Sequence, residues 1–181
     1  IIRTPDFFYI SIKNGVLYGY IIDIVNRGSE LVILAVGMTL VTAASGGQDI
    51  SVGAVMAVSA AICCQILSGG QVSATTLAAP IFLAALAGIA ASGACGAVNG
   101  LLVANLGIQP MVATLILFTA GRGIAQLITA GQITYVRVDS YKVIGDHIGS
   151  CPIPTPIFIA LAVVLIMKLI LKKTALGLYV E

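Results

Sequence analysis

The sequence predicts an all-α membrane protein, a bundle of transmembrane helices that crosses the bilayer several times. Of its 181 residues, 59% are hydrophobic and only 9% are charged, whereas soluble domains have about 45–50% apolar and about 25% charged residues. The mean hydropathy of +1.10 agrees with this. Between Glu30 and Arg122, 91 residues contain one charge, Asp49. This composition excludes a soluble enzyme, a disordered tail and a nucleic-acid-binding protein.

The apolar segments are predicted to be helices rather than strands. A spanning helix needs about 20 predominantly apolar residues, whereas a strand of a membrane β-barrel needs about ten residues in strict alternation. The apolar runs of this sequence are long and do not alternate. Residues 1–29 differ, because charged and aromatic side chains are mixed there, as is typical of a membrane interface. We therefore expect 1–29 to be an extracytoplasmic, interfacial segment with a helix near 21–29.

Five spans are expected, and turn residues separate them. The third is longer than a membrane-normal helix requires, which predicts a tilt, a kink or a break, with Pro80 in its first turns. The fourth begins at Pro110, because proline suits the first residue of a helix. The most polar stretch, 131–155, is predicted to be an extracytoplasmic loop. The expected spans are approximately 30–45, 50–68, 74–104, 110–129 and 156–171.

The orientation is predicted from the last span. Lys172 and Lys173 favour a cytoplasmic end by the positive-inside rule, and counting back through five spans then places 1–29 outside the cell. Charge counting alone does not orient the chain, since several basic residues would also lie outside. We expect 1–181 to be a single transmembrane domain that is truncated at both ends, because Ile1 is not a methionine and an apolar helix stops just before Glu181.

Asp49 is the most informative charge, because it follows two glycines and Gln48 in a long uncharged stretch, and we expect a broken helix at this Gly-Gly-Gln-Asp segment, 46–49. An ionisable group at membrane depth costs on the order of 2.5–3.5 kcal/mol on insertion scales. Non-helical backbone at that depth survives only where it is buried in protein or lines a cavity. Two roles remain open: Asp49 caps the amides of the helix that follows, or it lines or gates a solute pathway.

Three further polar side chains lie inside or near apolar spans. Arg122 stands between two glycines in the fourth span, and Gln126 lies one turn further on the same face. Such a guanidinium either snorkels to the interface or lines an aqueous cavity. Asn99 serves either as interhelical glue or as a group for a hydroxyl-rich substrate. The candidate pathway residues are therefore Gln48, Asp49, Asn99, Arg122 and Gln126.

Small residues recur at every fourth position of two spans. Such stripes let helix backbones approach closely, which matters in lipid, where no hydrophobic force drives helices together. They indicate a bundle of several helices rather than a single anchor. The stripe of the second span contains Gly53, Ala57 and Ala61, and that of the third contains Gly88, Ser92, Gly96 and Gly100.

No motif for catalysis or for a cofactor is present. The spacing of the four cysteines, with Cys63 and Cys64 adjacent, suits neither a disulfide framework nor a zinc site, and we interpret them as small buried hydrophobic residues. A Gly-rich loop ending in Gly-Lys-Ser/Thr, a metal-binding cluster and a Ser/His/Asp set are all missing from the sequence. We therefore expect no catalytic residue, metal or cofactor, and no nucleic-acid partner.

Several motifs resemble those of one family. The sequence GGQDISVG at 46–53 resembles the GGIDLSVG signature of the membrane permeases of bacterial monosaccharide ABC importers, with Gln48 in place of the usual isoleucine. Segments that also fit this family are 37–41, 99–103 and 109–115. Segments that look most like its galactofuranose branch are 4–8, 121–125, 129–133 and 173–177.

The resemblance implies a fold, partners and a location. Family permeases have about ten helices per subunit and work as dimers, so this sequence would be the middle portion of one subunit. The implied partners are an ABC ATPase subunit, a periplasmic sugar-binding protein, a second permease subunit (identical or different) and membrane lipid. The implied location is the bacterial inner membrane, with multiple passes.

Three hypotheses for function follow. The first is a permease subunit that moves a monosaccharide, with galactofuranose as a candidate, into the cytoplasm by alternating access, while a partner chain hydrolyses ATP and this chain catalyses no reaction. The second is a gradient-driven secondary carrier or channel for a small polar solute. The third is a membrane subunit with a purely structural role.

Overall fold

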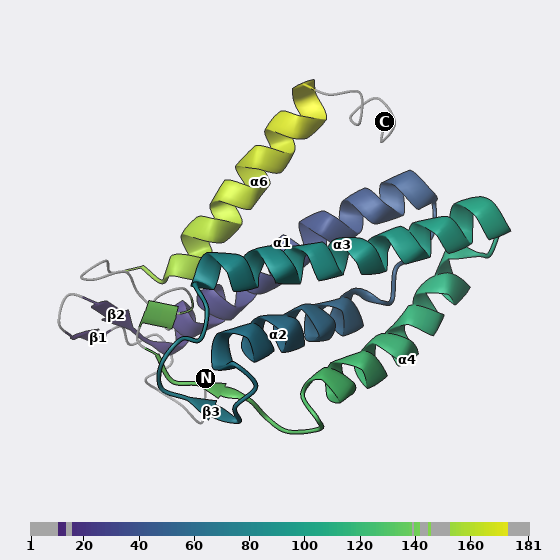
Figure 1. The fold of residues 1–181 in the computed structure, drawn as a ribbon. Helices are drawn as coiled ribbons and strands as arrows, with labels where there is room; N and C mark the ends of the chain where they lie inside the picture. Colours follow the sequence, from purple (N-terminus) through teal and green to yellow (C-terminus); the bar gives the residue numbers. More distant parts are fainter. Residues whose placement is uncertain (1–10, 14–15, 139, 142–144, 146–152, 174–181) are drawn as a thin grey trace, which may run out of the picture. The chain divides into compact units, whose positions relative to one another are not determined.

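A computed structural model of the chain describes residues 11–13, 16–138, 140–141, 145 and 153–173 (Figure 1). The predicted all-α class is confirmed, with two short strand pairs added to the helices. The chain divides into two compact units, one formed by residues 41–138 and the other by residues 1–40 together with 139–181. All of the candidate pathway and packing residues lie in the unit of 41–138.

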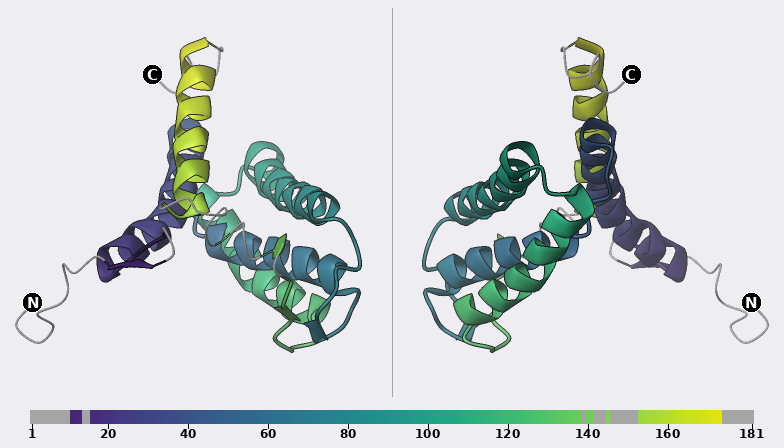
Figure 2. Two further views of the ribbon diagram at one scale, coloured as in Figure 1. Left: turned by 90° about the vertical axis from the view of Figure 1, so that its left-hand side faces the viewer. Right: turned by 90° about the vertical axis from the view of Figure 1, so that its right-hand side faces the viewer.

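The unit of residues 41–138 is built around α2 (Val52–Ser68). This helix packs against both α3 (Ile81–Leu106) and α4 (Pro110–Ile128) (Figure 1). Figure 2 shows the same three helices from two further sides. The buried apolar side chains of this unit are mostly small, which allows the close packing expected of membrane helices. They are Ala54, Val58, Ala61, Leu67, Ala74, Ala84 and Ala113.

Contacts between α2 and α4 show that the two helices run in the same direction. Just before α2 begins, the Ile50 N–H donates a hydrogen bond to Thr114 Oγ1, near the start of α4. Further along both helices, a Cβ placed on Gly121 would lie 3.1 Å from Ala54 Cβ. The contacts follow one another in the same order along both helices, so α2 and α4 are parallel.

Contacts between α2 and α3 show the opposite direction. Asn99, near the end of α3, donates to Ser51 at the start of α2. Cys63, near the end of α2, donates to the carbonyl of Ala84 at the start of α3. The two helices are therefore antiparallel, in agreement with successive spans of alternating direction.

A parallel strand pair joins the segments that follow α2 and α4. It consists of β3 (Ser73–Ala74) and β4 (Tyr135–Val136), with Ser73 opposite Tyr135 and Ala74 opposite Val136. Since α2 and α4 are parallel, both helices deliver their following segments to the same end of the unit. The strand pair holds the residues before β4 near the end of α2, which β4 also contacts.

The third expected span, 74–104, is corrected at its start. α3 begins at Ile81, and Pro80 is its N-cap residue, with φ −63° and ψ 141°, rather than part of its first turns. Proline has no backbone N–H and disfavours helical conformation in the residue before it, so the helix cannot extend back through Pro80. At the other end, Gly107 takes a left-handed conformation, φ 64°, and terminates the helix.

The other unit contains α1 (Tyr20–Ser45) up to residue 40, α6 (Thr155–Lys173), and the antiparallel pair β1 (Ser11–Lys13) and β2 (Val16–Tyr18). The separate helix expected near 21–29 is wrong, because α1 runs without a break from Tyr20 to Ser45. Its 26 residues span about 39 Å, more than the about 30 Å of the hydrocarbon core, so its charged first turns can lie outside that core.

Among the described residues, four helices are long and apolar enough to cross a membrane: α1, α3, α4 and α6. The fifth, α2, is apolar but has only 17 residues, about 25 Å of helix. In a membrane, the non-helical residues before α2 would have to cover part of the remaining thickness. This makes the hydrogen bonding of those residues important.

Candidate functional site

Residues 46–51 are non-helical and lie between the end of α1 at Ser45 and the start of α2 at Val52. Within this segment, Asp49 holds a turn. The Asp49 Oδ1 atom accepts the Ser51 N–H at 2.7 Å and the Ser51 hydroxyl at 2.6 Å. Asp49 therefore lies two residues before the N-cap, Ser51, and bonds to the cap residue rather than to the first turn of α2.

Two residues of α4 hold the same segment. The Ile50 N–H donates to Thr114 Oγ1 at 3.3 Å, and that hydroxyl donates to the Met111 carbonyl at 3.1 Å. A Cβ placed on Gly47 would lie only 2.6 Å from Pro110 Cβ, so only glycine allows this approach of backbone to ring. Side chains thus satisfy two consecutive backbone N–H groups, those of Ile50 and Ser51, that no helix satisfies.

Asn99 links α3 to this network. Its Nδ2 donates to the Ser51 hydroxyl at 3.2 Å, and Ser51 is almost fully buried. The Asn99 Oδ1 atom is also buried and has no hydrogen-bond partner among the described residues. Exchanging the amide oxygen and nitrogen would not help, because the Ser51 hydroxyl hydrogen already goes to Asp49. The network therefore runs from Asp49 through Ser51 to Asn99.

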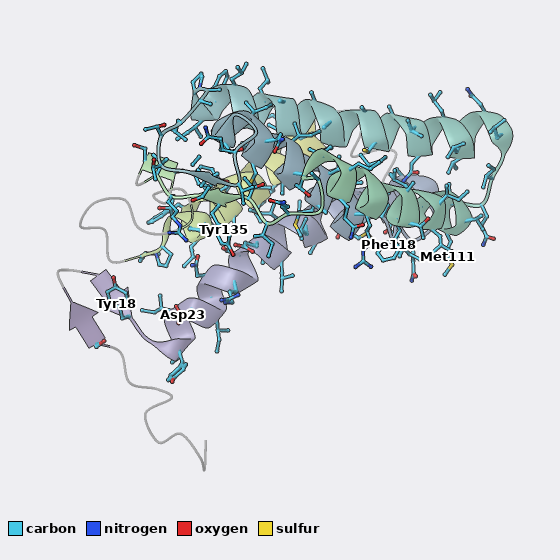
Figure 3. The ribbon with its side chains drawn as sticks, turned by 60° about the horizontal axis from the view of Figure 1, so that its bottom comes forward. Tyr18, Asp23, Met111, Phe118 and Tyr135 are labelled. Atoms are coloured by element: carbon cyan, nitrogen blue, oxygen red, sulfur yellow. The ribbon has the colours of Figure 1, made fainter. Side chains whose placement is uncertain are left out.

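Arg122 and Gln48 lie apart from this network. Both are exposed. The Arg122 guanidinium lies 5.5 Å from the centroid of the Phe118 ring, one turn earlier on α4, and Figure 3 labels Phe118 on this helix. A cation over an aromatic ring gains about 0.5–1 kcal/mol at an exposed site. Within the described part of the chain, no carboxylate forms an ion pair with Arg122.

A hollow of about 270 Å³ lies between α2 and α4, at the end of the unit near the strand pair. One wall is formed by Ala57, Ala60, Ala61 and Cys64 of α2. These residues are three or four positions apart and therefore lie on one face of the helix. The rest of the lining consists of the apolar Ala125 and Ile133 and of four side chains that can form hydrogen bonds, and none of the lining residues is charged. These polar side chains are Gln126, Thr129, Gln132 and Thr134.

The structure thus separates the five predicted pathway residues into three groups. Asp49 and Asn99 meet through Ser51, Gln126 lines the hollow, and Gln48 and Arg122 are in neither place. Of the polar residues that the prediction missed, Thr129 could have been found, since it is three residues from Gln126 on one helix face. The positions of Gln132 and Thr134 depend on the β3–β4 pair, which no local pattern predicts.

Only some residues of the two small-residue stripes contact a neighbouring helix. A Cβ on Gly88 would lie 2.6 Å from Cys63 Sγ and 2.8 Å from Ser59 Oγ, so α2 and α3 are in close contact there. Ser92 donates to the Gly88 carbonyl, and Ala57 and Ala61 line the hollow. For Gly53, Gly96 and Gly100 no described atom lies within 4 Å of such a Cβ, and their packing role stays a prediction.

The cysteines are free thiols where the structure describes them, namely Cys63, Cys64 and Cys95. Cys63 Sγ donates to the Ala84 carbonyl at 3.0 Å, and Cys64 faces the hollow. Each is partly accessible rather than fully buried. Cys151 and much of the predicted loop 131–155 fall outside the described residues.

A family model covers most of this chain. Residues 20–181 match the family described as the branched-chain amino acid transport system / permease component. The chain belongs to this permease family. Membership explains the long apolar helices and confirms the interpretation as an integral membrane transport protein. The prediction of a multi-pass protein of the bacterial inner membrane agrees with the four helices that can cross a membrane.

Several curated relatives are permeases for sugars. The chain is 44% identical to the galactofuranose transporter permease protein YtfT of Escherichia coli, over 98% of this chain and 49% of that protein. It is 36% identical to the fructose import permease protein FruF of Bifidobacterium longum, over 97% of this chain and 48% of that protein. It is 32% identical to the ribose import permease protein RbsC of Haemophilus influenzae, over 98% of this chain and 50% of that protein.

These matches show how much of a full-length permease the chain covers. It spans about half the length of the curated relatives that it matches. No solved structure matches it significantly. The segment 46–53, quoted above for the family resemblance, forms the bonded turn before α2, so the most specific motif and the best-defined polar network coincide.

Proposed function

We propose that this chain is part of the permease subunit of an ATP-binding-cassette importer that carries a monosaccharide into the bacterial cytoplasm by alternating access. The observation that carries the proposal is the set of sugar permeases among its relatives, which includes a galactofuranose permease 44% identical to it over 98% of its length. Galactofuranose is the first candidate substrate.

The lining of the hollow supports a neutral, hydroxyl-bearing solute. Its polar side chains are amides and hydroxyls, which can both donate and accept hydrogen bonds, as sugar hydroxyls require. The alanine face of α2 offers an apolar surface to the C–H groups of a sugar ring. Gln126 is therefore the candidate pathway residue with the strongest support, and Asp49 and Asn99 are assigned to the shape of the segment before α2.

A second candidate is a branched-chain amino acid, which the description of the family favours. An amino acid carries a carboxylate and an ammonium group, and burying these charges without partners is costly. None of the residues lining the hollow is charged, so this part of the chain suits a sugar better. An uptake experiment separates the two.

The partners belong to the proposal as well. An ATPase subunit supplies the energy, a periplasmic sugar-binding protein delivers the solute, and a second permease subunit completes the translocation path. This chain would catalyse no chemistry itself, since no part of the proposed role requires bond cleavage. Its contribution would be a path of hydrogen-bonding groups between helices.

The test is uptake by cells that lack their own monosaccharide importers and express the complete permease with its ATPase and binding protein. Radiolabelled galactose, fructose, ribose and leucine are compared. We expect saturable uptake of at least one sugar and no uptake of leucine above that of cells with an inactive ATPase. Transport of leucine and of none of the sugars would reject the proposal in favour of the second candidate.

A further inference from the structure

We infer that the hollow between α2 and α4 is a contact site for the sugar ring, with Gln126, Thr129, Gln132 and Thr134 binding hydroxyl groups opposite the α2 face that ends at Cys64. This inference rests on the proposed function and locates a point on the chain where the sugar would bind. It assigns a role to three residues, Thr129, Gln132 and Thr134, that are not among the five candidate pathway residues. It also gives Cys64 a use as a reporter.

The hydrogen-bonding capacity of the hollow is largely unused. The side-chain amides of Gln126 and Gln132 are exposed and make no hydrogen bond within the described residues. The Thr129 hydroxyl donates to the Ala125 carbonyl at 3.1 Å, so its lone pairs remain available as acceptors. Two amides and two hydroxyls thus converge on one space from a single helix end and the segment after it.

The backbone holds these groups in place. The turn at the end of α4 is closed by hydrogen bonds from Gly131 N–H to the Gln126 carbonyl at 2.8 Å and from Gln132 N–H to the Thr129 carbonyl at 3.0 Å. Directly afterwards, Tyr135 N–H donates to the Val72 carbonyl at 2.8 Å. Residues 132–134 are therefore fixed at both ends, which reduces the entropy lost when a ligand binds.

The charge of the hollow limits its ligand more than its size does, because the hollow is shallow and open. Its volume of about 270 Å³ is near the lower end of the roughly 300–1,000 Å³ of ligand pockets. The absence of charged lining residues disfavours phosphorylated sugars and amino acids. With Lys172 and Lys173 cytoplasmic, as the sequence predicts, the hollow lies toward the outer ends of α2 and α4, where solute would arrive.

The experiment measures protection of Cys64 from a membrane-impermeant maleimide. The complete permease, with its ATPase and binding protein in right-side-out vesicles, carries Cys64 as its only cysteine, with every other cysteine replaced by serine. Labelling is followed with and without saturating galactose, fructose or ribose, and uptake of the same sugars is measured in the same vesicles. The matched control retains only Cys95, a thiol of α3 that does not line the hollow.

We expect a transported sugar to slow labelling of Cys64 at least three-fold and to leave labelling of Cys95 unchanged. A second arm compares Thr129→Val with Thr119→Val, because both hydroxyls donate to carbonyls of α4 but only Thr129 lines the hollow. Thr129→Val should raise the apparent KM for uptake three-fold or more, and Thr119→Val should not change it.

Three results would overturn the inference. A Cys64 that no maleimide reaches in sugar-free vesicles would show that the hollow is not open to solvent. Equal labelling with and without a sugar that the vesicles do take up would remove the site and leave the proposed function intact. Failure of all three sugars to enter would reject the proposed function itself, and the site with it.

Discussion

At the scale of single residues, the segment before α2 depends on side chains that replace helical hydrogen bonds. Thr114 accepts the N–H of Ile50, and Asp49 accepts the N–H of Ser51. A backbone donor buried without a partner costs about 1–3 kcal/mol. In a membrane no water replaces a lost acceptor, so the loss of either side chain should destabilise the segment before α2.

The first prediction concerns Thr114, which is almost fully buried. Thr114→Val keeps the shape of the side chain and removes the acceptor for the Ile50 N–H, so we expect the free energy of unfolding to fall by about 1–3 kcal/mol. The measurement is unfolding of the purified permease in mixed detergent micelles. Thr119→Val is the control, since Thr119 is exposed and bonds only to its own helix, and it should change stability by less than about 0.5 kcal/mol. Equal losses in both variants would contradict the role of Thr114.

The second prediction separates the two roles left open for Asp49. Asparagine retains an oxygen that can accept both hydrogen bonds from Ser51, whereas alanine does not. We therefore expect Asp49→Asn to keep at least half of the wild-type uptake rate and Asp49→Ala to lower the amount of folded permease several-fold. Size-exclusion chromatography and uptake measure the two effects. If both variants fold normally and both lose uptake, the negative charge itself acts in the pathway.

At the scale of elements, α2 is the helix on which the unit of residues 41–138 is assembled. It packs antiparallel to α3 and parallel to α4, and a glycine of each neighbour, Gly88 of α3 and Gly121 of α4, permits a close approach to α2. Such contacts replace the hydrophobic drive that is missing between helices in lipid. The packing is therefore sensitive to single methyl groups.

The third prediction tests this sensitivity with two glycines of α3. In Gly88→Ala the new methyl group would overlap Cys63 Sγ and Ser59 Oγ, so we expect a loss of about 1–3 kcal/mol of unfolding free energy. Gly96→Ala adds a methyl group where no described atom lies within 4 Å, and alanine favours a helix by about 0.8–1 kcal/mol over glycine. The same micelle unfolding assay compares them. A Gly88→Ala variant as stable as Gly96→Ala would show that the α2–α3 contact is looser than described.

Much of the element order could be predicted from the sequence, for physical reasons that can be named. Pro110 begins α4, and Gly69 and Gly107, both left-handed, end α2 and α3. These residues act locally, so they are readable without a structure. The expected start of the third span at 74 was wrong, because the prediction followed the apolar residues before Pro80, whereas the helix begins only after this proline.

The polar site was predictable only in part. Asp49 and Asn99 stood out because polar groups are rare inside spans, and the structure joins them through Ser51. The Ile50–Thr114 bond connects residues 64 positions apart, and the β3–β4 pair is only two residues long on each side. Contacts of this kind depend on how helices stack, which periodicity and propensity do not encode.

At the scale of the whole molecule, membership of the permease family and the sugar permeases among the relatives lead to the proposed importer. Residues 41–138 supply a parallel helix pair, an uncharged hollow and a bonded turn before α2. The low charge of the sequence has a counterpart in this hollow, whose lining suits a neutral solute. The fourth prediction therefore concerns the energy source rather than any one residue.

The most direct test is sugar uptake by proteoliposomes that contain the complete permease and its ATPase, with ATP enclosed and the sugar-binding protein outside. Ionophores collapse the proton and sodium gradients in parallel samples. We predict that uptake requires enclosed ATP and continues at the same rate when both gradients are collapsed. Uptake that persists without ATP or the ATPase, and stops when a gradient is collapsed, would contradict the importer and establish a gradient-driven carrier.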